Sequence, residues 1–421
     1  MKVVIVNEGL GYPPNRGNWL RTLNLLLPLA RRHEITYLCR GADEENAEHA
    51  RSFYAEHGIR ALIVGSPAPE NRGLSFYARL GLNLLSPLPY SIAVHRSRSV
   101  RREIRRIARE EHVDVWQFES ISYADSLNGL GARTIAVAHN VESLIWQRHF
   151  ETEPSALRRS YVREQWRKYE RCEARLLNGV TQVVSVSEED ALLVRDRFGV
   201  RNTAVIENGV DVAYFGQTSR TQVDRHRILF VGSLDWRPNL DCLDILLEQI
   251  LPAVRRSEPR ATLCIVGRNP TTSLRRRVEG DPNVELFANV PDVRPYLAKA
   301  GVLAVPLRIG GGSRLKILEA MAAGLPVVST RIGSEGLIVE SGRELTVVDD
   351  VSDMANALVR VIRQPEHAMA MARNARLVVQ AHYDWTRLAD QLEQVWYRCA
   401  YARTAESLSR PEAGLSPVGA A

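Results

Sequence analysis

A short glycine run and the charged residues after it are the part of the sequence best suited to bind a phosphate. Glycines 310–312 are followed by Ser313, a good N-cap, and then by Arg314, Lys316 and Glu319 in a predicted helix. The first N–H groups of a helix have no partner inside it and carry the positive end of its dipole. Glycines let a phosphate approach such a backbone closely. We therefore expect a diphosphate to bind here, with Arg314 and Lys316 as its cations.

The charged residues of this stretch suit a nucleotide. Cations in the first turn of a helix oppose its dipole unless an anion is bound there. Lysine is also rare in the chain, because only four of its 55 lysines and arginines are lysines, and Lys316 is one of them. Glu319, one turn further on, could accept hydrogen bonds from both hydroxyls of a ribose. The alternative is a tight glycine turn with solvated charges, and the combination of Arg, Lys and Glu favours the nucleotide.

Apolar residues on both sides of the glycine run predict the elements that hold it. Residues 302–306 indicate a short buried strand that ends at a proline. Residues 314–323 repeat apolar side chains at helical spacing. Gly324 and Pro326 end that helix, and residues 327–329 begin another strand. Strand, loop, helix and strand make a βαβ crossover, the unit of a parallel sheet.

The stretch 318–328, LEAMAAGLPVV, resembles the donor-binding segment of GT-B glycosyltransferases of family 4. The family pattern is a Glu, seven residues and a second Glu, which here is Glu319. Gly311 stands where the first Glu belongs, so recognition of the donor sugar is expected to differ. The form GGGSRLKILEA resembles a subgroup tied to exopolysaccharide synthesis. The resemblance covers nearly the whole chain and implies an α/β fold, GT-B, with two Rossmann-like domains that face a central cleft.

The same resemblance implies roles for residues outside the glycine loop. Family members usually carry an Arg and a Lys on the diphosphate where this chain has Ser233 and Asn239. Arg237 is expected to compensate for these losses, together with Arg314 and Lys316. The donor-binding residues implied in all are Gly17, Arg237, Arg268, Val290, Gly311, Gly312 and Ser313, with Asn18 beside Gly17 as a further candidate.

His139 is the candidate from the first half of the chain. It follows the predicted strand 134–138 directly. The carboxyl ends of strands in an open α/β sheet are where such sheets bind ligands. The family has a histidine in a matching His-Asn turn that faces the acceptor or the donor sugar. The predicted catalytic set is therefore His139, Glu319, Lys316 and Arg314, although a lone histidine is more often structural.

Length and element order predict two domains. The chain has 421 residues, too many for one ordinary core. Strands and helices alternate in both halves, with residues 182–186 as the last strand of the first half, a helix through residue 175 before it, and a polar segment after residue 213. The predicted parts are 1–213 (acceptor side), 214–226 (linker), 227–382 (donor side), 383–403 (a helix crossing back to the first domain) and 404–421 (a disordered tail).

Composition points to a reduced compartment and to no metal. Hydrophobic residues make up 45% and charged residues 25%, as in ordinary globular proteins. The five cysteines are scattered singly, and no His cluster or Asp-x-Asp pair lies near the donor loop. The apolar start is too short for a signal peptide. We expect a cytoplasmic protein with no cofactor besides its nucleotide-sugar donor. The net charge of +6 is moderate, and no nucleic-acid signature is present.

Two segments of the first half allow contact with a membrane. Residues 74–85 are apolar with sparse arginines, and the predicted helix 100–111 carries five arginines on one side. Such a pair can lie on an anionic membrane surface. The helix is equally compatible with an ordinary outer helix of an arginine-rich protein. A peripheral location at the inner membrane face is therefore one of two expectations.

The predicted function is a retaining glycosyltransferase. It would move a sugar from a nucleotide-diphosphate donor to a glycan or polyprenyl-linked acceptor in exopolysaccharide or cell-surface polysaccharide synthesis. Helix N–H groups, Arg314 and Lys316 would stabilise the leaving diphosphate without a metal. A front-face departure is expected, in which the leaving phosphate takes the acceptor proton. The alternatives are a nucleotide-sugar epimerase on the same fold and an inactive scaffold that binds nucleotide sugars.

Overall fold

Two parallel sheets organise the chain. The structure, a computed structural model, describes residues 1–14, 17–69, 72–308 and 315–401. The first sheet has seven strands in the order β3-β2-β1-β4-β5-β6-β7, and the second has six in the order β10-β9-β8-β11-β12-β13. Every pairing between these strands is parallel. The predicted α/β class with two Rossmann-like units is confirmed.

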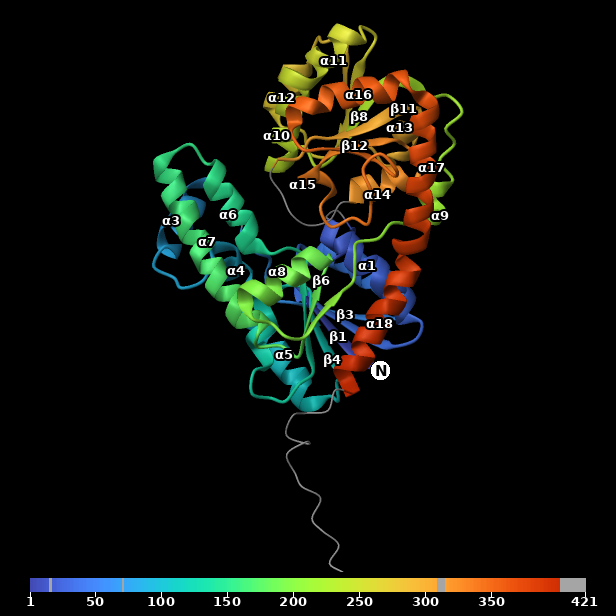
Figure 1. Cartoon of the computed structure of the whole chain (residues 1–421). Helices are drawn as coiled ribbons and strands as arrows, with labels where there is room; N and C mark the ends of the chain where they lie inside the picture. The colour runs from blue at the N-terminus through green and yellow to red at the C-terminus, as the bar shows by residue number, and fades with distance from the viewer. Residues whose placement is uncertain (15–16, 70–71, 309–314, 402–421) are drawn as a thin grey trace, which may run out of the picture.

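The first sheet and its helices form the N-terminal lobe, which lies below the other lobe in Figure 1. Its strands are β1 (Lys2–Asn7), β2 (Glu34–Arg40), β3 (Ile59–Val64), β4 (Val115–Phe118), β5 (Thr134–Ala138), β6 (Gln182–Ser185) and β7 (Thr203–Val205). Its helices are α1 (Gly17–Ala30), α2 (Glu44–Glu56), α3 (Gly73–Asn83), α4 (Tyr90–His95), α5 (Arg98–Glu110), η1 (Ile121–Leu127), α6 (Glu142–Thr152), α7 (Ala156–Leu177) and α8 (Glu188–Phe198). Helix α9 (Val212–Gly216) follows the crossover and packs in the apolar core of the other lobe, to which Phe215 belongs.

The second sheet and its helices form the C-terminal lobe. Its strands are β8 (Asp224–Val231), β9 (Thr262–Gly267), β10 (Val284–Ala288), β11 (Ala300–Val305), β12 (Val327–Thr330) and β13 (Thr346–Val348). Its helices are α10 (Arg237–Ile245), η2 (Leu246–Ile250), α11 (Leu251–Ser257), α12 (Thr272–Val278), α13 (Arg294–Lys299), α14 (Leu315–Ala322), α15 (Arg331–Ser334), η3 (Val351–Asp353), α16 (Met354–Arg363) and α17 (Pro365–His382).

Three details of the N-terminal lobe differ from the sequence-based expectation. The last strand is β7, not β6, and three residues are too few to give a clear periodic signal. The long helix expected through residue 175 is two helices, α6 and α7, separated at 153–155 around Pro154, which cannot donate a helical hydrogen bond. The buried side of α1 includes Arg21 and Thr22 between its leucines, so this face is partly polar.

The C-terminal helix returns to the N-terminal lobe. Helix α18 (Trp385–Tyr401) continues from α17 and runs down beside α1 (Figure 1). Its buried residues belong to the same apolar cluster as β1, β2 and α1. Polar contacts add to this packing, because His33 Nε2 lies 2.6 Å from Glu393 Oε1 and Arg32 Nη2 lies 2.8 Å from Asp390 Oδ1. The chain thus passes between the lobes twice, and the two passages lie side by side, because the Val210 N–H donates to the carbonyl oxygen of Tyr383 at 2.8 Å.

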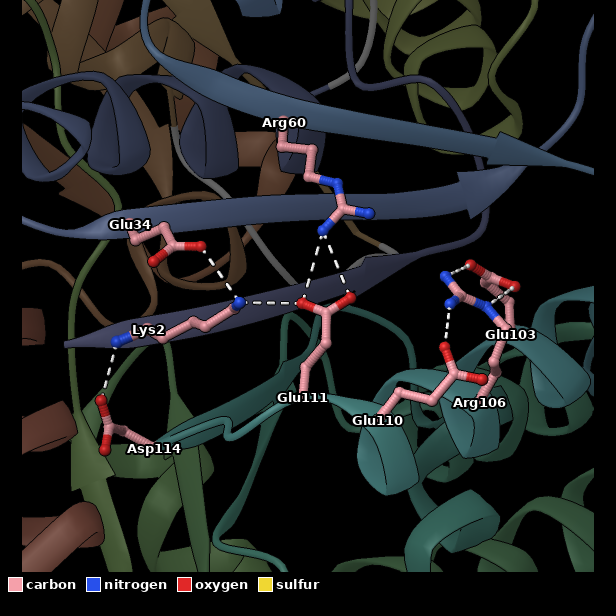
Figure 2. Close-up of polar contacts among 8 residues, drawn as sticks. All are labelled: Lys2, Glu34, Arg60, Glu103, Arg106, Glu110, Glu111 and Asp114. Carbon is pink, nitrogen blue, oxygen red and sulfur yellow. Dashed lines mark hydrogen bonds and ion pairs between the residues drawn. The ribbon is translucent and has the colours of Figure 1, made fainter.

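Charged residues close the amino edge of the first sheet (Figure 2). Lys2 Nζ lies 2.8 Å from Glu111 Oε2 and 3.1 Å from Glu34 Oε1, and the Lys2 N–H donates to Asp114 Oδ2 at 2.7 Å. Arg60 Nη1 adds a contact of 3.3 Å to Glu111. The hydrogen bonds from Lys2 lower the pKa of Glu111, and those from Glu111 and Glu34 raise the pKa of Lys2. The charges at this edge are therefore paired within the protein.

At the carboxyl edge of the second sheet, the backbone at the end of β9 packs closely against the loop that follows β8. A Cβ atom at Gly267 would lie 1.8 Å from the carbonyl oxygen of Gly232 and 2.7 Å from Leu234 Cγ. No side chain fits at that position without moving backbone. This close approach brings the ends of β8 and β9 next to each other and leaves room for the loops that follow them.

We predict that Gly267→Ala lowers the free energy of unfolding by about 1–3 kcal/mol, the usual cost of overpacking. Denaturant unfolding of the purified chain measures it. Gly81→Ala is the matched control, because no described atom lies within 4 Å of a Cβ there and α3 is helical at that point. Alanine in a helix is favoured over glycine by up to about 1 kcal/mol. Equal unfolding midpoints for the two variants would contradict the close approach of the two loops.

Candidate active site

Both lobes line one pocket between the two sheets. Val141, Arg148 and Asn208 bound it from the N-terminal lobe, and Glu335 and Tyr383 bound it from the other side. Val141 lies just after β5 and Asn208 just after β7, so the pocket is at the carboxyl edge of the first sheet. Ligands bind at this edge in doubly wound sheets. The predicted site residues are therefore to be compared with this interlobe cleft.

Lys316 lies where the sequence analysis needs a cation. Its Nζ donates to Asn239 Oδ1 at 2.9 Å and sits 4.7 Å from the centre of the Phe230 ring. Asn239 in turn donates from Nδ2 to the carbonyl oxygen of Ser233 at 2.9 Å. The lysine of α14 thus reaches the first turn of α10, which follows β8, and Asn239 is one of the two positions where the resemblance expects a cation that this chain lacks. Four residues of the predicted loop, Gly311, Gly312, Ser313 and Arg314, are outside the described residues.

Glu319 is half-buried on the same helix, one turn beyond Lys316. Burial raises the pKa of Glu319 to about 7, and the positive charge of Lys316 offsets this only in part. A carboxyl group in this setting is poorly solvated without a ligand. It gains most from a partner that donates hydrogen bonds to it, which a pair of sugar hydroxyls would do.

The loops that carry Arg268 and Val290 lie side by side. The Asn269 N–H donates to Asn289 Oδ1 at 3.0 Å, and the Asn289 N–H donates to the carbonyl oxygen of Gly267 at 2.8 Å. Both asparagines have positive φ, 55° and 54°. The Arg268 side chain is exposed and Val290 is half-buried at the rim. The two loops therefore lie together, and contact of Arg268 and Val290 with the donor stays a prediction.

His139 has a partner that the sequence analysis missed. Its Nε2 lies 2.9 Å from Oε2 of Glu119, and Thr22 Oγ1 donates to the same oxygen at 2.6 Å. Burial by itself would raise the pKa of Glu119, but hydrogen bonds from His139 and Thr22 and the charge of Arg21 lower it. A signal was present, because Glu119 follows β4 as directly as His139 follows β5.

Gly17 and Asn18 open α1 at the same edge. Gly17 is half-buried, and the carbonyl oxygen of Asn18 accepts a hydrogen bond of 2.9 Å from Thr22 Oγ1. This contact places the start of α1 one residue away from the carboxylate that holds His139. No contact of Gly17 with the C-terminal lobe is among those of the described residues, so its role at the donor stays a prediction.

Arg237 contacts the opposite lobe rather than the glycine loop. Its Nη1 bonds to Nε2 of His149, and its Nη2 lies 3.8 Å from Oε2 of Glu153. A second link runs from Arg148 to Glu335, whose nearest atoms are 3.0 Å apart. The expectation that Arg237 compensates for the missing diphosphate cations is not supported by this placement, because its guanidinium already bridges the cleft to α6.

Neither a metal cluster nor a thiol site is seen in the described part of the chain. No three His, Cys, Asp or Glu residues within it are grouped so that they could hold a metal ion. All five cysteines are buried and unpaired. The predicted residues Lys316, Glu319 and His139 do not line the pocket between the lobes. They lie elsewhere, as a lysine, a carboxyl with a raised pKa and a histidine held by a carboxylate.

Models of two known families match the two lobes. The family described as Glycosyltransferase Family 4 matches residues 20–214, and the family described as Glycosyl transferases group 1 matches residues 225–364. The chain is 26% identical over 418 residues to a GDP-mannose-dependent alpha-(1-6)-phosphatidylinositol monomannoside mannosyltransferase of Mycolicibacterium smegmatis, with 90% of this chain and 96% of that one covered. It is 23% identical to an uncharacterized 44.6 kDa protein in the cps region of Klebsiella pneumoniae, with 91% and 96% covered.

Solved structures resemble the fold over nearly its whole length. HepE of Anabaena, in complex with UDP and glucose, gives a TM-score of 0.63 at 15% identity, with 94% of this chain and 99% of that chain covered. A sucrose-phosphate synthase of Thermosynechococcus elongatus gives a TM-score of 0.69 at 18% identity, with 95% and 99% covered. At these identities the likeness concerns the fold alone.

The raised pKa of Glu319 predicts a pH-dependent effect of Glu319→Gln on stability. The pKa is about 7 in the folded chain and 4.5 as the ordinary value, so ionisation is penalised only in the folded state. That penalty is absent below pH 4.5, grows between pH 4.5 and 7 and is constant above. The melting temperature of the variant relative to wild type should therefore be higher at pH 8 than at pH 5. A difference that is the same at both pH values would place Glu319 in a better solvated position.

Proposed function

The chain belongs to the family 4 (group 1) glycosyltransferases of the GT-B fold, which use nucleotide-sugar donors, and we propose that it is a retaining enzyme of cell-surface polysaccharide synthesis. The observation that carries the proposal is the contact of Lys316 with Asn239, at 2.9 Å, in the first turn of the helix that follows β8. This puts a cation between two elements that the resemblance assigns to the donor diphosphate. Relatives that act on a lipid-linked mannoside or lie in a capsule region support the choice of pathway class.

The proposed mechanism assigns the leaving group to Lys316 and the start of α14. Negative charge grows on the diphosphate as the bond to the sugar breaks, so a fixed lysine stabilises the transition state more than the ground state. Glu319 binds the ribose hydroxyls and becomes ionised as it does so. This work needs no metal when Lys316 and Arg314 supply the charge, although Arg314 is outside the described residues.

Retention of configuration is proposed to follow a front-face path. A double displacement needs a carboxylate free to attack the sugar. The carboxylate next to His139 is Glu119, and it already accepts hydrogen bonds from Gln117, Thr22 and His139. The leaving phosphate then takes the acceptor proton, and His139 orients the reacting groups. The acceptor is proposed to be a glycan or a polyprenyl-linked sugar.

A panel of nucleotide sugars tests the proposed activity against its two rivals. Transfer to an added acceptor, or slow hydrolysis of one donor, supports the glycosyltransferase. A changed sugar that is still attached to its nucleotide identifies an epimerase. Binding measured by calorimetry without any turnover identifies an inactive scaffold. This alternative arises because Gly311 stands at the position of the first Glu of the family pattern. Product analysis by NMR also reports the anomeric configuration.

Lys316→Ala should slow transfer by about 100-fold or more, the scale seen when one preorganised transition-state contact is removed. Binding of the nucleoside alone should change little, since the lysine meets the diphosphate. The assay is run with EDTA in excess. Lys299→Ala, an exposed lysine at the end of α13, is the matched control and should keep wild-type turnover. Full activity of Lys316→Ala with EDTA present would remove the lysine from the mechanism.

Helix α5 is a poor candidate for the proposed membrane contact. Arg101 bonds to Asp125, Arg105 approaches the carbonyl oxygen of Ser126, and Arg106 pairs with Glu103 and Glu110, as Figure 2 shows for Arg106. Three of its five predicted membrane arginines therefore have partners in the protein. The free charge of this helix is smaller than its five arginines suggest, because Glu103 and Glu110 lie on α5 itself and Asp125 approaches it from η1.

Helix α3 is the better membrane candidate. Leu74, Tyr77 and Leu82 of α3 are 89%, 68% and 70% exposed, and Leu85, two residues past its end, is 88% exposed. The start of α7 adds exposed basic residues, and α7 packs against the end of α3 through Lys168, whose Nζ donates to the Asn83 carbonyl oxygen at 2.8 Å. Within the described residues, no helix is both long and apolar enough to span a bilayer. Apolar groups beside basic ones suit attachment to an anionic surface.

Replacing Leu74, Leu82 and Leu85 by Ser should reduce sedimentation with liposomes of anionic lipid at low salt. Each exposed leucine that enters the interface contributes about 1 kcal/mol or more, so three losses weaken binding by at least about 100-fold. Leu192→Ser on α8, half exposed and in another element, is the control. Hydrolysis of the soluble donor should be unchanged in both. If the wild-type protein does not sediment with the liposomes at any salt concentration, α3 does not bind this membrane and serves another partner.

A further inference from the structure

A buried chain of hydrogen bonds connects helix α18 to His139. Trp396 Nε1 donates to Gln117 Oε1 at 2.6 Å, and Gln117 Nε2 donates to Glu119 Oε1 at 2.5 Å. The other carboxylate oxygen, Oε2, lies 2.9 Å from His139 Nε2. Trp396, Gln117 and Glu119 are at most 4% exposed. This chain of hydrogen bonds therefore runs from the buried side of α18 to the carboxyl edge of the first sheet without passing through solvent.

The chemistry of the first member fixes the direction of every bond in the chain. An indole nitrogen can only donate, so the oxygen of the Gln117 amide must face Trp396 and its NH₂ group must face Glu119. An NH₂ group only donates, so Glu119 must accept on Oε1. Thr22 already donates to Oε2 at 2.6 Å. An ionised carboxylate has no proton to give, so His139 must carry its proton on Nε2.

A buried carboxylate needs compensating charge, and the surroundings of Glu119 supply it. Arg21 is 1% exposed, and its Nη2 donates to the carbonyl oxygen of Ile206 at 2.7 Å. Burial lowers the pKa of Arg21, and the charge of Glu119 opposes that effect. The arginine and the hydrogen bonds together keep Glu119 ionised in the interior. The carboxylate is therefore a permanent acceptor for His139 rather than an acid that competes for its proton.

We propose that Glu119 is a positioning residue that holds His139 as the Nε2–H tautomer and so leaves Nδ1 to meet the substrate. Nδ1 has no hydrogen-bond partner among the described residues, and the His139 side chain is 15% exposed at the sheet edge. The far end of the chain is Trp396, so docking of α18 sets the orientation of His139. The catalytic consequence of this inference rests on the proposed glycosyl transfer, whereas the tautomer itself does not.

Nitrogen NMR of protein labelled at histidine tests the tautomer directly. The signal of His139 among the ten histidines is assigned by its loss in His139→Asn. Wild type should show the Nε2–H form. Glu119→Gln introduces an NH₂ group among three donors, so it should shift the population toward the Nδ1–H form. Glu119→Asp keeps the carboxylate and should keep the Nε2–H form. A wild-type Nδ1–H form, or an unchanged tautomer in Glu119→Gln, would overturn the inference.

Kinetics separate positioning from mere packing. Glu119→Gln should lower kcat about 10- to 100-fold, the scale for loss of a group that orients a functional histidine, with the donor KM changed much less. Glu119→Asp should recover part of that kcat. Trp396→Phe keeps an aromatic ring but removes the N–H donor, and it should lower kcat about two- to tenfold. Wild-type kcat in both Glu119→Gln and Trp396→Phe would show that the chain only stabilises the fold.

A matched control comes from a second carboxylate–histidine pair, which Glu393 of α18 makes with His33. Glu393 contacts His33 at 2.6 Å on the same helix but away from the cleft. Glu393→Gln makes the same chemical change and should leave both the His139 tautomer and kcat unaltered. If it altered them as much as Glu119→Gln, general loosening of α18 would be the cause and the inference would fail. Absence of transfer by wild type would refute the proposed function, and the NMR result would still decide the tautomer.

Discussion

The return of α18 to the N-terminal lobe is the interaction on which the site depends. Both sheets are parallel, and each carries its own loops at the carboxyl edge of its strands, where such sheets bind ligands. Loops on two lobes form one cleft only if the lobes keep a fixed position relative to each other. Helix α18 does this by burying Trp385, Leu388, Leu392 and Trp396 in the core of β1 and α1. The Arg148–Glu335 and Arg237–His149 contacts link the lobes again at the cleft.

The two edges of the first sheet use charge in opposite ways. At the amino edge, Lys2, Glu34 and Glu111 pair with one another at the surface, where each pair contributes little to stability. At the carboxyl edge, Glu119 is buried and ionised among donors, and across the cleft Glu319 is half-buried with a pKa of about 7. Groups held in such settings are costly for folding, and functional sites are where such costs are commonly found.

Lys316 illustrates how a site can be rebuilt from a different element. The family resemblance places cations in the loop after β8, and this chain has Ser233 and Asn239 there. The amino group of Lys316 arrives at Asn239 from α14, an element of the crossover between β11 and β12. A cation from either element lies over the same carboxyl edge, because β8 and β11 are neighbours in the sheet. Position in the fold, rather than position in the sequence, decides which part of the sheet edge the charge can reach.

The sequence by itself determined the fold class, the βαβ unit from β11 to β12 and the returning helix, because local periodicity indicates each of them. It also supplied the candidates His139, Lys316 and Glu319, because their places after a strand or at a helix start are visible in the sequence. It did not determine β7, which is too short for a periodic signal, or the break between α6 and α7. Only the tertiary structure showed the partners. Glu119 meets His139 across two strands, Trp396 meets Gln117 over 279 residues, and Arg101 is neutralised by Asp125. Such pairs depend on strand order and helix docking, which no local pattern encodes.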